Sequence, residues 1–172
     1  MIQRICLYML LSVLGIMILC GGLFVINGIF LASGESPVSG TTPHPAISSD
    51  NAPSEIRIMA YNIAKGFVHK GGIRFEEKKV VLERLKRIAK IINAEQPHFV
   101  FLSEAMFECG PCPINQVVFL AEATGMRSWV FGENYNFGLP FYRIVGGNAI
   151  LSRFSMEAVA NPPLSGRQPF YV

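Results

Sequence analysis

Two apolar segments, each closing on a polar residue and separated by a helix-patterned stretch, constrain the fold of this chain most strongly. The first covers 56–63 and carries Asn62, and the second covers 98–104 and ends at Glu104. Between them, residues 74–94 repeat apolar side chains at helical spacing. A strand, a crossover helix and a second strand place the two strands side by side and parallel. We therefore expect Asn62 and Glu104 to meet at the carboxyl edge of a sheet, where α/β folds bind their ligands.

Beyond the second strand, helical and strand patterns continue to alternate, which indicates an α/β domain. The sequence predicts a helix over 115–124, a strand over 127–132, a Gly- and aromatic-rich loop over 134–146, a strand over 147–152 and an edge strand over 156–160. The aromatic side chains of the loop either pack on the sheet, line a substrate groove or touch a membrane surface.

The residue types at the predicted sheet edge suit a metal ion. A carboxylate from Glu104 and an amide carbonyl from Asn62 are oxygen ligands, which a hard cation such as Mg²⁺ prefers. Such an ion can polarise a phosphoryl group and stabilise the charge that builds up in the transition state. From position alone, Glu104 is equally a solvated residue at a strand end, and Asn62 is equally a turn residue.

Four short segments, read together, resemble a known family. They are Tyr-Asn-Ile at 61–63, Leu-Ser-Glu at 102–104, Leu-Ala-Glu-Ala-Thr-Gly at 120–125 and Gly-Asn-Ala-Ile-Leu-Ser-Arg at 147–153. Their order and spacing resemble the first half of an endonuclease/exonuclease/phosphatase (DNase I-like) domain, over roughly 55–172. The resemblance implies a sandwich of two sheets with outer helices, with this chain carrying the first half. It also implies a phosphoesterase that depends on Mg²⁺ or Mn²⁺ and acts on a nucleic acid, a phospholipid or an inositol phosphate.

The resemblance assigns roles to individual residues. It makes Glu104 the metal ligand, and it makes Asn62 the residue that orients the metal or the phosphate. Asn148 and Arg153 become candidates for substrate binding, although Asn148 also suits the start of a strand. Arg153, like Lys65, also suits an ordinary surface cation.

The resemblance further implies residues that this sequence does not carry. Similar proteins use a His that accepts a proton from water and an Asp that orients it. Here no His follows His98, and the only Asp is Asp50. We therefore expect a truncated catalytic domain in which no catalytic base is present, and a chain that by itself has no strong hydrolytic activity.

The segment Cys109-Gly110-Pro111-Cys112 matches the thioredoxin redox motif and lies between a predicted strand and a predicted helix. Glu108 stands where similar redox proteins carry Trp, and the flanking segments fit the phosphoesterase family. The two cysteines form a disulfide that clips the loop, stay as inert thiols, bind a metal or act as a redox pair. The alternative functions are therefore a membrane-tethered thiol–disulfide protein and a noncatalytic remnant.

Residues 5–32 contain no charged side chain and are almost all apolar. A transmembrane helix needs about 20 such residues, whereas the apolar part of a secretory signal has about 7 to 15. We expect an uncleaved, single-pass signal anchor; cleavage after Ala32 and secretion are the alternative. Residues 1–4, which include Arg4, are expected in the cytoplasm and the bulk of the chain outside it, because no other Lys or Arg precedes Arg57.

The rest of the composition predicts where the folded domain begins and what the protein binds. Residues 33–54 are rich in Ser, Pro, Gly and Thr, which predicts a flexible tether and a folded domain over 55–172. The formal net charge of +3 gives no strong signal for a nucleic-acid partner. The expected partners are therefore a phosphate ester and, through 5–32, a membrane.

Overall fold

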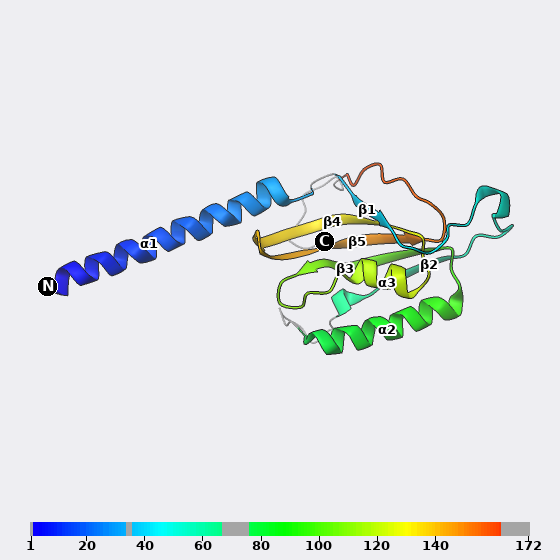
Figure 1. Ribbon diagram of the computed structural model, residues 1–172, viewed down its shortest axis with the longest axis horizontal. Helices are drawn as coiled ribbons and strands as arrows, with labels where there is room; N and C mark the ends of the chain where they lie inside the picture. Colours follow the sequence, from blue (N-terminus) through cyan, green and yellow to red (C-terminus); the bar gives the residue numbers. More distant parts are fainter. Residues whose placement is uncertain (1, 34–35, 67–75, 163–172) are drawn as a thin grey trace.

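The structure is a computed structural model that describes residues 2–33, 36–66 and 76–162. It contains a sheet with two helices packed on one face and a long helix that extends away from it (Figure 1). All strands of the described residues belong to this one sheet. In their order across it they are β1 (Val38–Thr41), β4 (Ser128–Leu139), β5 (Tyr142–Ser152), β3 (Phe99–Cys109) and β2 (Ile58–Asn62). The α/β class that the sequence predicts is confirmed.

The crossover unit at one edge of the sheet forms as predicted. β2 and β3 pair in parallel, with Asn62 opposite Ser103, and helix α2 (Lys78–Glu95) connects them across one face. Val81, Leu85 and Ile92 on α2 have no exposed surface. Their spacing places them on one side of the helix, and their burial against the sheet stabilises the unit.

A second helix, α3 (Gln116–Ala123), covers the same face of the sheet. The side chain of Asn115 caps its first turn by accepting a hydrogen bond from the Val118 N–H at 3.0 Å. The side chains that form the core come from both helices and from alternate positions of the strands. Its largest fully buried members include Leu85, Ile92, Val117, Leu120, Val100, Leu102, Phe131 and Leu151.

β3 does not end at Glu104 as the sequence predicts, but continues to Cys109. Its pairing with β5 shifts register between Leu102 and Ala105 and again between Met106 and Glu108. A register shift of this kind is a β-bulge, which bends a strand and re-aims a side chain without ending it. Glu104 therefore lies at a bulge within a strand.

The predicted loop over 134–146 is wrong, because these residues form most of a long β-hairpin. β4 and β5 pair antiparallel from Ser128 with Ser152 to Leu139 with Tyr142, so the hairpin loop contains only two residues. Gly138 and Pro140 interrupt the pattern here, so local composition indicated a loop and not two paired strands. The predicted edge strand over 156–160 is also wrong, since these residues form neither a strand nor a helix.

The predicted flexible tether over 33–54 needs correction as well. β1 lies within it and pairs antiparallel with β4 at the edge of the sheet. After β1, the Thr42 hydroxyl donates a hydrogen bond to the Met126 carbonyl at 2.6 Å. Gly40 permits the close approach of β1, because any side chain there would collide with the indole ring of Trp129. A short 3₁₀ turn, η2 (Ser49–Asn51), follows.

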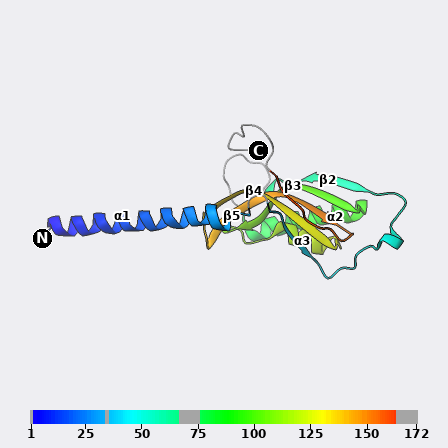
Figure 2. The ribbon, with the colours of Figure 1, turned by 90° about the horizontal axis from the view of Figure 1, so that it is seen from above.

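The amino-terminal segment is helical throughout its apolar run. Helix α1 (Ile2–Ile26) continues into a π-helical end, η1 (Asn27–Leu31). The 29 residues Gln3–Leu31 are long and apolar enough to cross a membrane, and none of their most apolar window is buried in the protein. The same description fits a signal sequence. Figure 2 shows that this helix projects away from the sheet.

The face of the sheet opposite α2 and α3 carries apolar side chains that no helix of the described residues covers. Ala60, Phe101, Ile150 and Val130 lie in register across four adjacent strands on this face. Phe101 is 42% exposed. We call this surface the open face of the sheet.

Candidate metal-binding site

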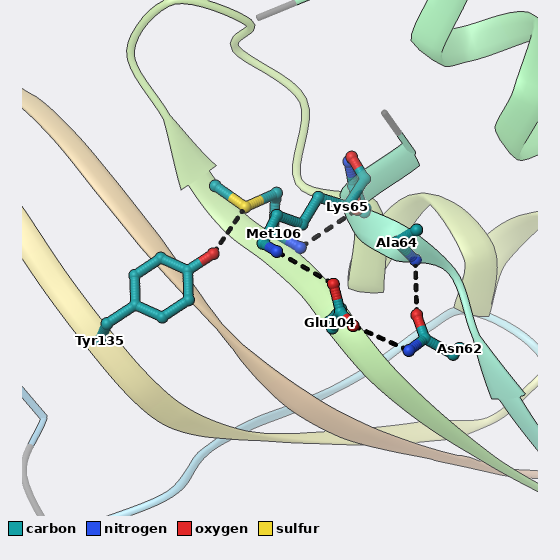
Figure 3. A network of polar contacts seen from close by, with 7 residues as sticks. Asn62, Ala64, Lys65, Glu104, Met106 and Tyr135 are labelled. Atoms are coloured by element: carbon teal, nitrogen blue, oxygen red, sulfur yellow. Dashed lines mark hydrogen bonds and ion pairs between the residues drawn. The ribbon is translucent and has the colours of Figure 1, made fainter. Parts of the chain in front are cut away.

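Asn62 and Glu104 contact each other directly, as the sequence predicts (Figure 3). The Asn62 side chain donates from Nδ2 to Glu104 Oε1 at 2.8 Å. Its Oδ1 accepts a hydrogen bond from the Ala64 N–H at 2.8 Å. The amide of Asn62 thus links the turn after β2 to the carboxylate on β3, and this fixes the orientation of both.

Lys65, which the sequence leaves as a possible surface cation, belongs to the same cluster. Its ammonium lies 2.9 Å from Glu104 Oε2. The two side chains are 39% and 43% exposed, so solvent screens the ion pair and it adds little to stability. The position of this ion pair is what matters here, because it places a positive charge at Oε2 of Glu104.

The backbone around this cluster adopts an uncommon conformation. Lys65 lies in the 3₁₀ turn η3 (Ala64–Gly66) that follows β2. Ala64, Lys65 and Glu104 have φ values of 46°, 58° and 56°, in the left-handed region that side chains with a Cβ disfavour. Each such residue costs on the order of 1–3 kcal/mol, and such strain tends to cluster at functional sites. Three of these residues within one polar cluster mark it as the candidate site.

Gln116 at the start of α3 holds the strained turn in place. Its side chain is 1% exposed. Its Nε2 donates to the Lys65 carbonyl at 2.6 Å, and its Oε1 accepts from the Met106 N–H at 3.1 Å. One amide therefore satisfies buried backbone groups on both segments that carry the site. The sequence gives no signal for this role, because a Gln in a first helical turn is unremarkable.

Tyr135 lies near the cluster, against Met106 (Figure 3). Its hydroxyl contacts Met106 Sδ at 3.3 Å. Burial, with a smaller contribution from the negative charge of Glu104, raises the pKa of Tyr135 to about 12. The phenol therefore stays protonated near neutral pH and cannot accept a proton from water there.

The structure brings Asn148 close to the site but places Arg153 away from it. Asn148, Asn62 and Ser103 line the same groove of about 550 Å³ on the open face. Arg153 instead donates to the Pro97 carbonyl at 3.0 Å, beside the amino end of β3. β3 is antiparallel to β5 and Phe99 pairs with Ser152, so Arg153 lies beside the start of β3, whereas Glu104 lies midway along that strand. Substrate binding by Asn148 stays a prediction, and Arg153 has a structural contact that accounts for it.

The donor atoms of the site fit a divalent cation in kind. Mg²⁺ needs only one or two carboxylates and takes its remaining ligands from water and substrate phosphate, so the carboxylate of Glu104 can serve. Any cation at Oε2 must displace the ammonium of Lys65. Among the described residues, no cluster of three or more His, Cys, Asp or Glu side chains could hold a metal ion.

The two described histidines lie elsewhere. The His44 ring contacts the Glu122 carbonyl at 2.9 Å, and the His98 ring accepts a hydrogen bond from the Arg57 N–H at 2.9 Å. The third histidine, His69, lies outside the described residues. The described part of the chain thus places no histidine base at Glu104.

Cys109 ends β3 and Cys112 lies in the turn that follows it, and both are buried free thiols. Burial raises the pKa of each thiol, whereas a reactive redox cysteine has a lowered pKa and some exposure. This environment disfavours the redox alternative. The disulfide between them stays a prediction.

The comparisons with known proteins give one partial likeness. No protein-family profile matches the chain, and no curated protein matches it. The chain is similar to the crystal structure of an endonuclease/exonuclease/phosphatase from Beutenbergia cavernae, with a TM-score of 0.40 and 24% identity. The similarity covers 57% of this chain and 26% of that one. The geometry of the site, and not this likeness, supports the proposals that follow.

Proposed function

We propose that this chain contributes a divalent-cation site to a metal-dependent phosphoesterase, with Glu104 as the carboxylate ligand of Mg²⁺ or Mn²⁺. The observation that supports this proposal is the polar cluster of Glu104, Asn62 and Lys65 on strained backbone. Strain of this size persists only where the surrounding structure enforces it, and here Gln116 supplies that support.

Each residue of the cluster has a distinct task. Glu104 supplies the negative charge that holds the cation, and Asn62 fixes the rotamer of that carboxylate. Lys65, which pairs with Oε2 of Glu104, would be free to donate to an oxygen of the phosphate ester if a cation took its place at that oxygen. A bound Mg²⁺ would polarise the phosphoryl group.

We further propose that residues 5–32 anchor the chain in a membrane with the sheet domain on the extracytoplasmic side. The apolar helix has no buried surface in its most apolar window, which suits a membrane span. Retention of the anchor is supported by the hydrogen bond that joins its carboxyl end to the domain: Arg143 Nη1 donates to the Leu31 carbonyl at 3.2 Å. Cleavage after Ala32 would remove that contact.

A cation-binding experiment on the full chain in detergent micelles tests the metal site. Mn²⁺ binding is measured by its effect on water proton relaxation. We expect Glu104→Gln to lower the affinity at least about tenfold, since losing even an outer partner of a metal ligand costs that much. Glu95→Gln, the same change at an exposed residue at the end of α2, is the matched control. Equal affinities in the two variants would defeat the proposal.

A turnover assay tests the expectation of low activity. Because the described residues place no histidine base at Glu104, we expect the chain to hydrolyse bis(p-nitrophenyl) phosphate no faster than its Glu104→Ala variant in Mg²⁺. Robust Mg²⁺-dependent turnover that Glu104→Ala abolishes would show that the chain supplies its own base.

A further inference from the structure

The end of the β4–β5 hairpin exposes aromatic side chains that are not part of the buried core. Phe137, Phe141 and Tyr142 are 43%, 76% and 51% exposed. Exposed aromatic residues on one turn are costly to leave in water, and such patches mark sites of contact with another surface. We refer to these three residues as the aromatic tip.

The hairpin is fastened to the carboxyl end of the apolar helix. The Asn27 side chain donates from Nδ2 to Asn136 Oδ1 at 3.1 Å, and the Ser33 N–H donates to Glu133 Oε2 at 3.3 Å. Arg143, next to the aromatic tip, adds its bond to the Leu31 carbonyl. These contacts join residues about one hundred positions apart, so the hairpin and the helix end form a single assembly.

Two further contacts, both between Arg143 and Glu108, hold the base of the aromatic tip against β3. The Arg143 guanidinium donates to Glu108 on β3, with Nε 2.9 Å from Oε2, and it also forms an ion pair with Oε1. Arg143 thus connects β3, the hairpin and the helix end. The tip is held by this connection and is not a free loop.

The position of the tip matches the depth at which the helix would leave a bilayer. The 29 residues Gln3–Leu31 span about 44 Å at 1.5 Å per residue, whereas the hydrocarbon core is about 30 Å thick. With Arg4 at the opposite surface, the last turns, which include Asn27, fall in the interfacial layer. Figures 1 and 2 both show the hairpin tip beside these turns and directed back along the helix.

We propose that the aromatic tip inserts into the interfacial layer of the same phospholipid bilayer that α1 crosses, as a second membrane contact of the domain. Aromatic side chains favour this layer because their rings are apolar while the Tyr hydroxyl stays hydrated. This inference rests on the proposed membrane anchor. With two contacts, the domain is fixed in orientation relative to the bilayer, and does not swing about a single point.

Tryptophan fluorescence tests this placement, because Trp129 is the only Trp of the chain. In a Trp129→Phe background, Phe141→Trp puts the only indole at the tip. Ile56→Trp, in the same background, puts it at an exposed residue that precedes β2, and is the matched control. The full chain is reconstituted into phosphatidylcholine vesicles with or without lipids that are brominated on the acyl chains near the headgroup.

We expect brominated lipid to quench most of the emission of the Phe141→Trp variant and little of the emission of the Ile56→Trp control. Equal quenching in the two variants, while the protein floats with the vesicles, would overturn the insertion and leave the anchor standing. A blue-shifted but unquenched Phe141→Trp signal would mean that protein covers the tip, which also overturns it. Failure of the chain to float with the vesicles would overturn both the anchor and the insertion.

A second measurement avoids substitution altogether, since Trp129 is largely buried and its replacement could disturb folding. The unaltered chain is irradiated in vesicles that carry a diazirine lipid, and modified peptides are identified by mass spectrometry. We expect adducts on residues 137–142 in addition to the apolar helix. Adducts confined to residues 2–31 would contradict the proposal.

Discussion

The two faces of the sheet show how differently neighbouring residues of one strand are used. On β3, Val100 and Leu102 point toward α2 and α3 and are 0% and 2% exposed, whereas Phe101 between them is 42% exposed. Successive side chains of a strand point to opposite faces, so one apolar run supplies both surfaces. The helix-covered face carries the stability of the domain, and the open face carries the groove beside Asn62.

The largest expected effect is on the free energy of unfolding, which should fall more for a substitution on the helix-covered face than for one on the open face. Leu85→Ala removes a fully buried side chain of α2 and should lower the free energy of unfolding by about 2–5 kcal/mol, because it leaves a cavity in the core. Phe101→Ala, on the open face, should cost less than half of that, since Phe101 is partly solvated already. Urea unfolding of the full chain in micelles, followed by Trp129 fluorescence, measures both. Equal losses would show that another part of the protein covers the open face.

A smaller loss of stability is expected when a polar side chain on the helix-covered face is replaced by Leu. Gln116→Leu leaves the Lys65 carbonyl and the Met106 N–H without their side-chain partner, which should cost about 1–3 kcal/mol. It should also weaken Mn²⁺ binding, because the strained turn at Lys65 loses its support.

The matched change on the open face is Asn148→Leu, at an exposed residue. It should alter stability by no more than about 0.5 kcal/mol. If Gln116→Leu lowered stability and left Mn²⁺ affinity intact, Gln116 would be a structural residue and not a positioning residue of the site.

Thiol chemistry sharpens the contrast without a large change in stability. Cys109 and Cys112 lie on the buried side, and burial raises their pKa values. Both should therefore react slowly with iodoacetamide at mildly alkaline pH. A cysteine introduced on the open face by Ala60→Cys should react much faster, as mass spectrometry of each peptide will show. Rapid modification of Cys109 in the native chain would revive the redox alternative.

The last effect is absent near neutral pH and is confined to alkaline pH. Burial raises the pKa of Tyr135 to about 12 from the ordinary value of 10.0, so the unfolded chain releases this proton first. The free energy of unfolding should therefore fall as the pH rises from about 10 to about 12. The Tyr135→Phe variant should lack this component of the fall. A phenolate absorbance titration in which Tyr135 ionises with the other tyrosines would contradict the assignment.

Much of the crossover unit could be predicted from sequence because its signals are local. The apolar spacing of α2 and the two apolar strands predicted a parallel pair with Asn62 beside Glu104, and the hydrogen bond between their side chains confirms it. The predicted ends of the strands were less accurate, since β3 continues past Glu104 to Cys109. Nothing in the sequence around Glu104 signals a bulge, because the register of β3 depends on its pairing with β5.

Elsewhere local composition was misleading. The Ser-, Pro- and Gly-rich stretch over 33–54 predicted a tether, yet β1 within it adds to the sheet edge, because β4 offers a free edge to pair with. The composition of residues 134–146 predicted a loop, yet these residues form the end of a β-hairpin. Gly138, just before the hairpin turn, has a φ of 118°. In both cases a partner that is distant in sequence decided the conformation.

The sequence by itself determined the long apolar helix, the α/β alternation and the pairing of Asn62 with Glu104, because each follows from periodicity or from the direction of neighbouring strands. Only the tertiary structure decided that Lys65 completes the cluster, that Gln116 supports it and that the hairpin lies against the helix end. Those features depend on contacts between segments that are distant along the chain. Such contacts form because buried polar groups need partners, and neither periodicity nor composition specifies which partner is within reach.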